Sequence, residues 1–419
     1  MEPYWLCGKL VDYRGLLGEG CLRIAGGRIV ELSKIPKPGE GVRDYIGKGV
    51  LVAPGFIDIH VHLRGLEQSY KETEETGGWA AARAGITLIV DMPNTVPRAS
   101  TPDIVALKLA DLSKAPVDHS LFAGIPESQD LEGVSRLPIA GYKIYPNDLL
   151  ELRTSKVLRE WRGLVVLHPE LPESEMIIEE KVWSRGILRG CWMEAVSLEV
   201  VASVGPVSRI HVTHASCPAT IVLAKKLGYS VDVAPHHLLY DYRDGDGCMY
   251  KVNPPIRGSG EKASLQQMLL NGVIDAVASD HAPHALWEKS DPLYCSPGIP
   301  WLEVWPWIIH RLVSARALSL GEFHRLVSRG PARILGLKDY GSLHPGARAN
   351  LVVYNPNIRS RFEGPRHSMA RHYPSIMQEV SGWPVEVIVG GVTVYYMDQP
   401  VHAKPGINPF TSRMLSRPA

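Results

Sequence analysis

The stretch GFIDIHVHL, residues 55–63, opens a series of apolar runs that decides the fold. Seven further runs rich in Val and Ile follow it, and segments of helical period separate most of them. They are GITLIVDMPN (85–94), HSLFAGIP (119–126), AGYKIYP (140–146), LVVLHPE (164–170), RIHVTHAS (209–216), YSVDVAPHH (229–237) and VIDAVASDHAPH (273–284). A strand followed by a helix, repeated eight times, predicts an α/β fold of the TIM-type (β/α)8 barrel class.

An open, doubly wound sheet is the structural alternative to the barrel. Such a sheet would need only about five or six strands, and the turn after the first run lacks the GxGxxG pattern. The barrel therefore remains the favoured fold. We expect helices in the stretches of helical period, which are residues 73–84, 101–114, 149–161, 174–204, 217–227 and 260–271.

The two ends of the chain have a different pattern. Residues 1–50 read as short strands with glycine turns, and Gly26-Gly27 suits a hairpin. The segments GSLHPGARANLVVYNP (341–356) and VEVIVGGVTVYYMD (385–398) alternate and turn in the same way. We therefore predict a catalytic barrel over residues 51–340 and a small composite β domain built from residues 1–50 and 341–419.

The composition is that of a globular protein with almost no net charge. The chain of 419 residues has 45% hydrophobic side chains, and 45 Lys and Arg balance 44 Asp and Glu. This balance excludes a disordered chain and argues against a binder of nucleic acid or membranes. No apolar run reaches the ~18 residues of a membrane-spanning helix. MEPYWLCGKL at residues 1–10 lacks the regions of a signal peptide, so we expect a cytoplasmic protein.

The cysteines are scattered along the chain. The six residues are Cys7, Cys21, Cys191, Cys217, Cys248 and Cys295, with neither CxxC nor paired spacing. This spacing indicates neither a disulfide framework nor a thiolate zinc site. We expect buried cysteines that pack as small hydrophobic side chains.

Polar residues end most of the eight runs, and active sites of such barrels lie where the strands end. His60 and His62 are two residues apart on one strand, so their imidazoles face the same side and can bind one metal ion. An isolated His-x-His is more often an ordinary hydrogen-bonded pair. Here His168, His214 and Asp280 also end strands, and four imidazoles with a carboxylate exceed the needs of one tetrahedral ion. We therefore predict two metal ions.

Lys143 stands in the middle of GYKIY (141–145). The two predicted metal ions would require an anionic group that bridges them at this place. A lone lysine is usually a solvated surface group. Among apolar neighbours, however, loss of solvation and nearby cations would lower its pKa and leave the amine free to react. Reaction with carbon dioxide would turn this amine into an anionic carbamate with two ligand oxygens.

Together these motifs resemble the amidohydrolase superfamily and, within it, the dihydroorotases. The resemblance covers nearly the whole chain, from PGFIDIHVHLR (54–64) through GYKIY, LHPE (167–170), HVTHAS (211–216), APHHL (234–238), KVNPPIR (251–257) and SDHAPH (279–284) to GSLHPGARANLVVYNP. It implies that His60 and His62 bind one zinc ion and that His168 and His214 bind the other. Carbamylated Lys143 and a hydroxide would bridge these ions. Asp280 would be the remaining metal ligand and the general base.

The activity that this resemblance implies is the reversible cyclisation of N-carbamoyl-L-aspartate to L-dihydroorotate, with release of water, in pyrimidine biosynthesis. A water that bridges two metal ions is acidic enough to be hydroxide near neutral pH. One of the ions polarises the ring carbonyl that this hydroxide attacks. Asp280 would take the proton of the hydroxide and pass it to the departing ring nitrogen.

Arg64 separates this activity from those of related enzymes. It continues the alternation of residues 60 and 62, so its guanidinium should face the same barrel mouth and bind a carboxylate by two hydrogen bonds. The resemblance implies that Asn94 and His284 share this carboxylate and that Asn253 lies on a loop lining the substrate pocket. Hydantoinases, dihydropyrimidinases and allantoinases could use the same metals on other cyclic amides, but a neutral ring would give Arg64 no partner.

Several of these side chains have a purely structural alternative. Arg64 could form an ion pair with Glu67 or Glu72, and Asn94 could cap a helix or shape a turn. Glu170, two residues after His168, could orient a metal ligand or could be a surface carboxylate.

Other positions bear on the pocket without an assigned chemical role. His236 and His237 match the family's pattern without being ligands there, and we interpret them as structural support for the barrel mouth. Trp301, in GIPWLE (298–303), stands where many relatives have glycine, so we expect a reshaped pocket rim.

We expect a small-molecule substrate as the partner, and neither nucleic acid nor a membrane. The sequence leaves open a homodimer and an association with aspartate transcarbamoylase. It also leaves open a catalytically silent relative that keeps the fold as a scaffold. Such proteins commonly lose ligands, whereas all six expected metal-binding positions are present here.

Overall fold

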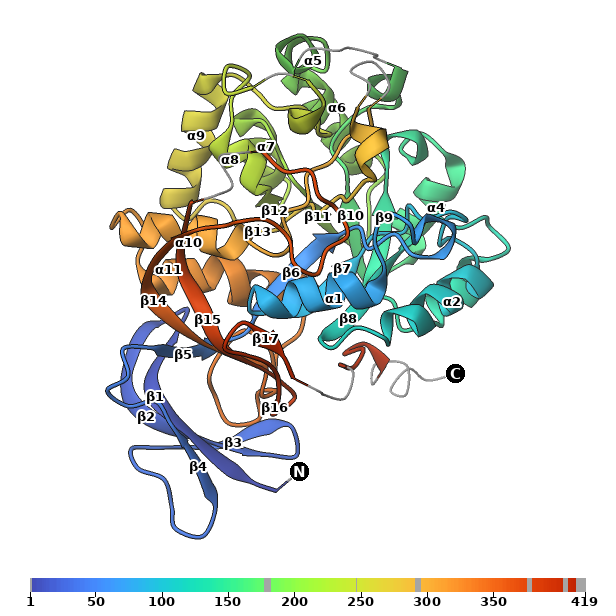
Figure 1. Ribbon diagram of the computed structural model, residues 1–419. Coiled ribbons are helices and arrows are strands. Elements are labelled where there is room, and N and C mark those ends of the chain that lie inside the picture. Colours follow the sequence, from blue (N-terminus) through green and yellow to red (C-terminus); the bar gives the residue numbers. More distant parts are fainter. Residues whose placement is uncertain are drawn as a thin grey trace.

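The predicted barrel is confirmed by a computed structural model, which describes residues 2–176, 182–245, 247–290, 295–374, 379–401 and 406–411. Eight parallel strands lie in sequence order in one sheet: β6 (Phe56–Val61), β7 (Ile86–Asp91), β8 (Asp118–Gly124), β9 (Gly141–Ile144), β10 (Leu164–Leu167), β11 (Arg209–Val212), β12 (Ser230–Val233) and β13 (Ala276–Val277). A bridge between Val61 and His281 joins the segment after β13 back to β6. The sheet therefore closes on itself (Figure 1).

Helices cover the outside of this barrel, which explains why strands β6, β7 and β8 are buried along their whole length. The main ones are α1 (Glu74–Arg83), α2 (Pro102–Leu112), α4 (Leu152–Glu160), α5 (Val182–Leu188), α6 (Cys191–Ser203), α7 (Pro218–Lys226) and α9 (Ser259–Leu270). Shorter or later helices are α3 (Leu131–Ser135), α8 (Pro235–Leu239), α10 (Trp305–Ser314), α11 (Leu320–His324) and α12 (Gly330–Leu335). None of the helices in the described ranges combines the length and apolar character that a membrane crossing requires.

The helical stretch expected over residues 174–204 is not one helix. Helix α5 ends at Leu188, and α6 begins at Cys191 after Gly190, whose backbone is extended (φ −68°, ψ 161°). Residues 177–181 of that stretch lie outside the described residues. Because glycine is a poor helix former, Gly190 divides the stretch where the hydrophobic period alone suggests continuity.

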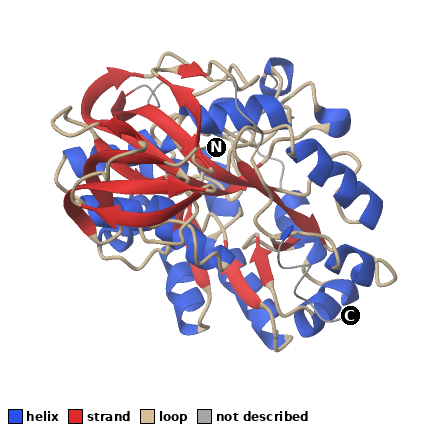
Figure 2. Cartoon of the chain, turned by 90° about the horizontal axis from the view of Figure 1, so that it is seen from below, coloured by secondary structure: helices blue, strands red, loops and turns tan. Residues whose placement is uncertain are grey.

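Both ends of the chain contribute to a second, nine-stranded sheet, as predicted. The N-terminal strands are β1 (Tyr4–Asp12), β2 (Gly15–Ala25), β3 (Arg28–Ser33), β4 (Gly41–Asp44) and β5 (Leu51–Pro54), and the C-terminal ones are β14 (Leu351–Arg361), β15 (Glu379–Val389), β16 (Val392–Tyr396) and β17 (Gln399–Pro400). Strands β5 and β14 pair antiparallel and join the two halves. Gly26 and Gly27 turn between β2 and β3 with φ of 55° and 74°. Figure 2 shows this sheet beside the helices of the barrel.

The cysteines correct a sequence-based expectation, because all six are paired. The disulfides are Cys7–Cys21, Cys191–Cys217 and Cys248–Cys295, and no free cysteine is left among the described residues. Cys7 and Cys21 lie directly opposite each other on antiparallel strands β1 and β2. Cys191 and Cys217 stand at the beginnings of α6 and α7. Spacing along the chain could not predict these pairs because strand register and helix packing bring the sulfur atoms together.

Candidate metal centre and substrate site

The six predicted metal-binding residues gather where the barrel strands end. His60 belongs to β6 and Lys143 to β9, His62 and His168 directly follow β6 and β10, and His214 and Asp280 lie two and three residues after the ends of β11 and β13. All six side chains are buried, namely His60, His62, Lys143, His168, His214 and Asp280. Three residues at this mouth have positive φ although they are not glycine: Arg64 (59°), His214 (40°) and Asp280 (50°). Such backbone strain costs on the order of 1–3 kcal/mol per residue and clusters at functional sites.

His60, His62 and Asp280 form a compact group suited to one cation. Oδ1 of Asp280 lies 3.3 Å from Nε2 of His60 and 3.3 Å from Nε2 of His62. One ligand atom from each of the three residues can be chosen so that all lie within 4.8 Å of one another. Burial raises the pKa of Asp280 to about 7, and the charge of Lys143 partly offsets this effect.

His168 and His214, which come after β10 and β11, lie beside this group. Their ring centroids are 4.6 Å apart, and the His214 ring is 4.9 Å from the His60 ring. Burial lowers the pKa of all four imidazoles, and the positive charge of Lys143 adds to this effect in each. The four rings are therefore neutral at physiological pH and keep a lone pair that can bind a metal.

Lys143 is a basic side chain that lies among these candidate ligands. Its Nζ is buried and has no hydrogen-bond partner among the described residues. Burial lowers its pKa to about 7. A substantial fraction of the amine is therefore unprotonated near neutral pH, which is the form that reacts with electrophiles.

Hydrogen bonds orient the two imidazoles of β6. Nδ1 of His60 lies 2.6 Å from Oγ1 of Thr213, whose hydroxyl can donate to Asp232 at 3.1 Å. Nδ1 of His62 lies 2.6 Å from Oδ1 of Asn94. Because both oxygens accept from Nδ1–H, each ring presents Nε2 to the centre. The sequence analysis missed Thr213 and Asp232, although an acid within the apolar run of β12 was a usable signal.

Arg64 is turned into the protein, beside His284. Its Nη2 lies 3.1 Å from Nε2 of His284, and its Nε donates to the carbonyl oxygen of Pro283 at 3.3 Å. The side chain is buried and, within the described part of the chain, makes no ion pair with Glu67 or Glu72. The structure thus brings together two of the residues expected to bind a substrate carboxylate, while Asn94 contacts His62.

Glu170 links His168, a predicted metal ligand, to Arg189, which contacts the predicted substrate loop. Its Oε2 accepts from Nε2 of His168 at 2.8 Å, and its Oε1 accepts from Nε of Arg189 at 2.9 Å. Arg189 also donates to Oδ1 of Asn253 at 2.6 Å. Burial alone would raise the pKa of Glu170, but its bonds to His168 and Arg189 outweigh this and lower it to about 2. Glu170 is therefore an anion that orients His168, and Arg189 had no signal in the sequence.

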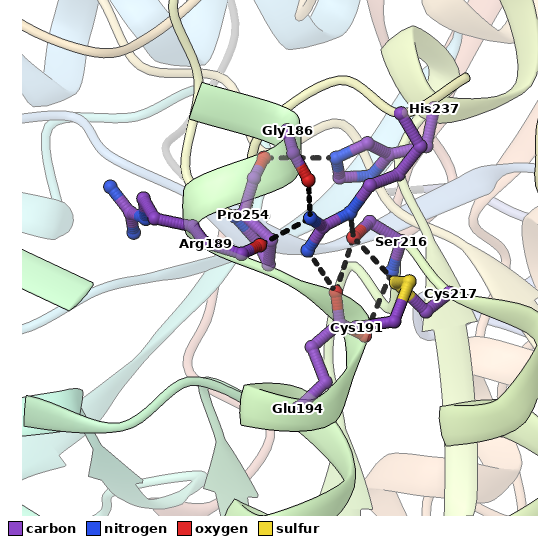
Figure 3. The surroundings of a disulfide bond; sticks show 9 residues. Gly186, Arg189, Cys191, Glu194, Ser216, Cys217, His237 and Pro254 are labelled. Atoms are coloured by element: carbon purple, nitrogen blue, oxygen red, sulfur yellow. Dashed lines mark hydrogen bonds and ion pairs between the residues drawn. A yellow bond between two sulfur atoms is a disulfide. The ribbon is translucent and has the colours of Figure 1, made fainter. Parts of the chain in front are cut away.

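The Cys191–Cys217 disulfide links the start of α6, near Arg189, to the start of α7 (Figure 3). Cys191 lies two residues after Arg189, and Cys217 lies three residues after His214. Arg257 adds a second link, because it donates to Glu194 of α6 at 3.0 Å and to Oγ of Ser216 at 2.8 Å. Helices α6 and α7 are thus joined covalently, and the buried ion pair of Glu194 with Arg257 adds a link from α6 to Ser216, just before α7.

We expect the Glu170→Gln variant to bind metal roughly 10- to 100-fold more weakly, because His168 loses its anionic acceptor. Competition with a chromophoric chelator would measure this change. Glu386→Gln is a matched control, since Glu386 is a buried carboxylate that pairs with Arg43 in the β sheet. Equal metal affinities in wild type and Glu170→Gln would contradict the role of Glu170.

Replacing Cys191 and Cys217 together by serine should lower the free energy of unfolding by about 3 kcal/mol, because the cross-link spans 26 residues. Chemical denaturation without reductant would measure the loss. As a companion test, wild-type protein unfolded without reductant should expose no reactive thiols. A titre of six thiols per chain would show that the pairs do not form.

The chain is similar to known proteins over most of its length. A family model described as "Dihydro-orotase-like" matches residues 49–148, and one described as "Amidohydrolase family" matches residues 203–395. The dihydroorotase of Aeropyrum pernix is 40% identical over 393 residues, which cover 90% of this chain and 91% of that protein. The dihydroorotase of Saccharolobus solfataricus is 37% identical over 390 residues, covering 91% and 93%.

Solved structures with the same fold carry other names. L-hydantoinase from Arthrobacter aurescens superposes with a TM-score of 0.86 at 20% identity, covering 96% of this chain and 98% of that chain. Dihydropyrimidinase from Brevibacillus agri superposes with a TM-score of 0.84 at 22% identity, covering 97% and 98%. At these identities the likeness shows a shared fold and does not decide between substrates.

Proposed function

Because the chain belongs to the dihydroorotase family of the amidohydrolases, we propose that it catalyses the reversible cyclisation of N-carbamoyl-L-aspartate to L-dihydroorotate. The observation that carries this choice of substrate is the buried Arg64 beside His284, next to the group of His60, His62 and Asp280. Both forms of the substrate bear a carboxylate, which a buried guanidinium can bind through two charge-assisted hydrogen bonds.

We further propose that two zinc ions occupy the centre. His60 and His62 would hold one ion, His168 and His214 the other, and Asp280 would complete the set. The neutral rings with fixed Nε2 or Nδ1 lone pairs support this assignment, as does the unpartnered amine of Lys143, which suits a carbamate bridge. When bound, the metal pair supplies an acidified water and polarises the carbonyl under attack.

Asp280 is the acid–base residue in this proposal. Its Oδ1 faces the imidazoles of His60 and His62, which leaves Oδ2 to hold a proton on the other side of the carboxylate. In ring opening it accepts a proton from the attacking water and donates it to the departing ring nitrogen. In ring closure the same oxygen carries the proton back.

An assay of metal-replete protein tests the proposal. Dihydroorotate and carbamoyl aspartate should be interconverted, whereas hydantoin, dihydrouracil and allantoin should turn over far more slowly because they offer Arg64 no carboxylate. Turnover of hydantoin or allantoin with none of dihydroorotate would reassign the substrate. Protein purified without chelator that contains no metal would favour a silent scaffold.

A further inference from the structure

His236 and Trp301 form a contact that the proposed mechanism does not yet use. His236 lies in α8, after the end of β12, and Trp301 lies in the loop that follows the last barrel strand. Both side chains are completely buried. Nε1 of the Trp301 indole donates to Nδ1 of His236 at 3.2 Å. The indole of Trp301 therefore points toward His236 at the barrel mouth.

This contact determines which nitrogen of His236 carries the proton. An indole N–H can only donate, so Nδ1 of His236 must present its lone pair. The ring is then neutral, and its hydrogen is on Nε2. Nε2 has no hydrogen-bond partner among the described residues, and it lies 4.0 Å from Oδ2 of Asp280. The buried N–H thus faces the oxygen of Asp280 that His60 and His62 do not contact.

We propose that His236 is a positioning residue for Asp280 and that Trp301 holds it in the required tautomer. His236 directs Nε2–H at Oδ2 and so keeps Oδ1 turned toward His60 and His62. The separation shortens to a hydrogen bond in the substrate complex, since contacts between catalytic groups are often long before the substrate binds. This inference rests on the proposed role of Asp280.

The neighbouring His237 makes a different contact from that of His236. Nε2 of His237 lies 3.1 Å from the carbonyl oxygen of Pro254, next to Asn253 on the predicted substrate loop (Figure 3). Its ring centroid is 4.3 Å from that of His236. One ring of the pair thus faces Asp280 and the other supports the loop. A movement of α8 would therefore displace both rings.

The test compares two tryptophan variants in metal-replete protein. Trp301→Phe keeps an aromatic ring but removes the N–H that holds His236. Trp307→Phe is the matched control, because Trp307 is also completely buried and its N–H donates to the carbonyl oxygen of Ala84 at 2.9 Å. We expect kcat to fall on the order of tenfold in Trp301→Phe only, with KM and metal content unchanged, and similar decreases in Tm in both variants. Equal kcat values in the two variants would overturn the proposal.

A spectroscopic measurement on the wild type reads the tautomer of His236 directly, and a variant serves only to assign the signal. Nitrogen-15 NMR of histidine-labelled protein should show His236 as the Nε2–H tautomer, with its signal assigned by its loss in His236→Gln. A wild-type ring protonated on Nδ1 would overturn the inference. Failure of the proposed function is distinguishable, because wild-type protein would then not turn over dihydroorotate, whereas failure of the proposed role of Asp280 would leave Asp280→Asn active. If Asp280→Asn is inactive but Trp301→Phe is fully active, the proposed role of Asp280 stands and only the positioning role of His236 and Trp301 is overturned.

Discussion

Lys143→Ala protein is expected to lose most of its zinc and its activity. The variant removes the only group among the ligands that can become an anionic bridge, and the site then holds neutral imidazoles and one carboxylate. Two dications close together would repel each other without that bridge. Because the bound metals supply several kcal/mol of transition-state stabilisation, kcat/KM should fall on the order of a thousandfold or more.

Metal analysis after gel filtration would measure the loss of zinc. Lys289→Ala is the matched control: burial also lowers the pKa of Lys289 to about 7, but its Nζ donates to the carbonyl oxygens of Ser296 and Gly298 at 2.9 and 3.0 Å. That variant should keep its metal. Wild-type protein incubated with carbon-13 bicarbonate should show a carbamate NMR signal that Lys143→Ala lacks. A Lys143→Ala enzyme with two zinc ions per chain and wild-type turnover would refute the bridge.

Arg64→Ala is expected to keep its metal and to lose affinity for the substrate. Arg64 contacts His284 and the carbonyl oxygen of Pro283, and none of the six predicted metal-binding residues depends on it for a hydrogen bond. Loss of a charge-assisted hydrogen-bonding group costs about 1.5–3 kcal/mol, which corresponds to a roughly 10- to 150-fold fall in kcat/KM. Most of this loss should appear as a higher KM for dihydroorotate.

Arg64→Lys provides the graded comparison. A lysine restores the positive charge but not the planar pair of N–H donors, so its kcat/KM should lie between those of wild type and Arg64→Ala. Zinc content should equal that of wild type in both variants. If Arg64→Ala bound dihydroorotate as tightly as wild type, Arg64 would have no role in substrate choice, and the hydantoinase-like alternatives would regain weight.

The candidate metal-binding positions are predictable from the sequence because they follow from strand geometry. His60 lies on β6 and His62 one residue beyond it, and His168, His214 and Asp280 lie one to three residues after the ends of β10, β11 and β13. Parallel strands of a barrel bring their carboxyl ends to one mouth, so residues distant in sequence can be assigned to one site from the sequence alone. The expectations of a cytoplasmic location, a homodimer and an association with aspartate transcarbamoylase stay predictions.

The hydrogen bonds around the predicted ligands and the substrate loop could not be predicted from the sequence in this way. Asn94 is predicted to bind the substrate carboxylate, and that role stays a prediction, while its Oδ1 contacts His62 in the structure. Asn253 was assigned to the substrate loop, and Arg189 reaches its Oδ1 from between α5 and α6. Trp301 is expected to reshape the pocket rim, which stays a prediction, and the structure adds that its indole N–H contacts the buried His236. In each case the partner comes from an element whose distance and orientation no local pattern encodes.

The amino-acid sequence alone determined the barrel, the composite β sheet and the set of chemical groups at the barrel mouth, because hydrophobic period and strand ends are local properties of the chain. Only the tertiary structure decided which cysteines pair, which nitrogen of His60, His62 and His168 faces the centre, and how Glu170, Arg189 and Trp301 support the site. These features depend on contacts between side chains far apart in sequence, and packing in three dimensions selects such contacts from many that the sequence would allow.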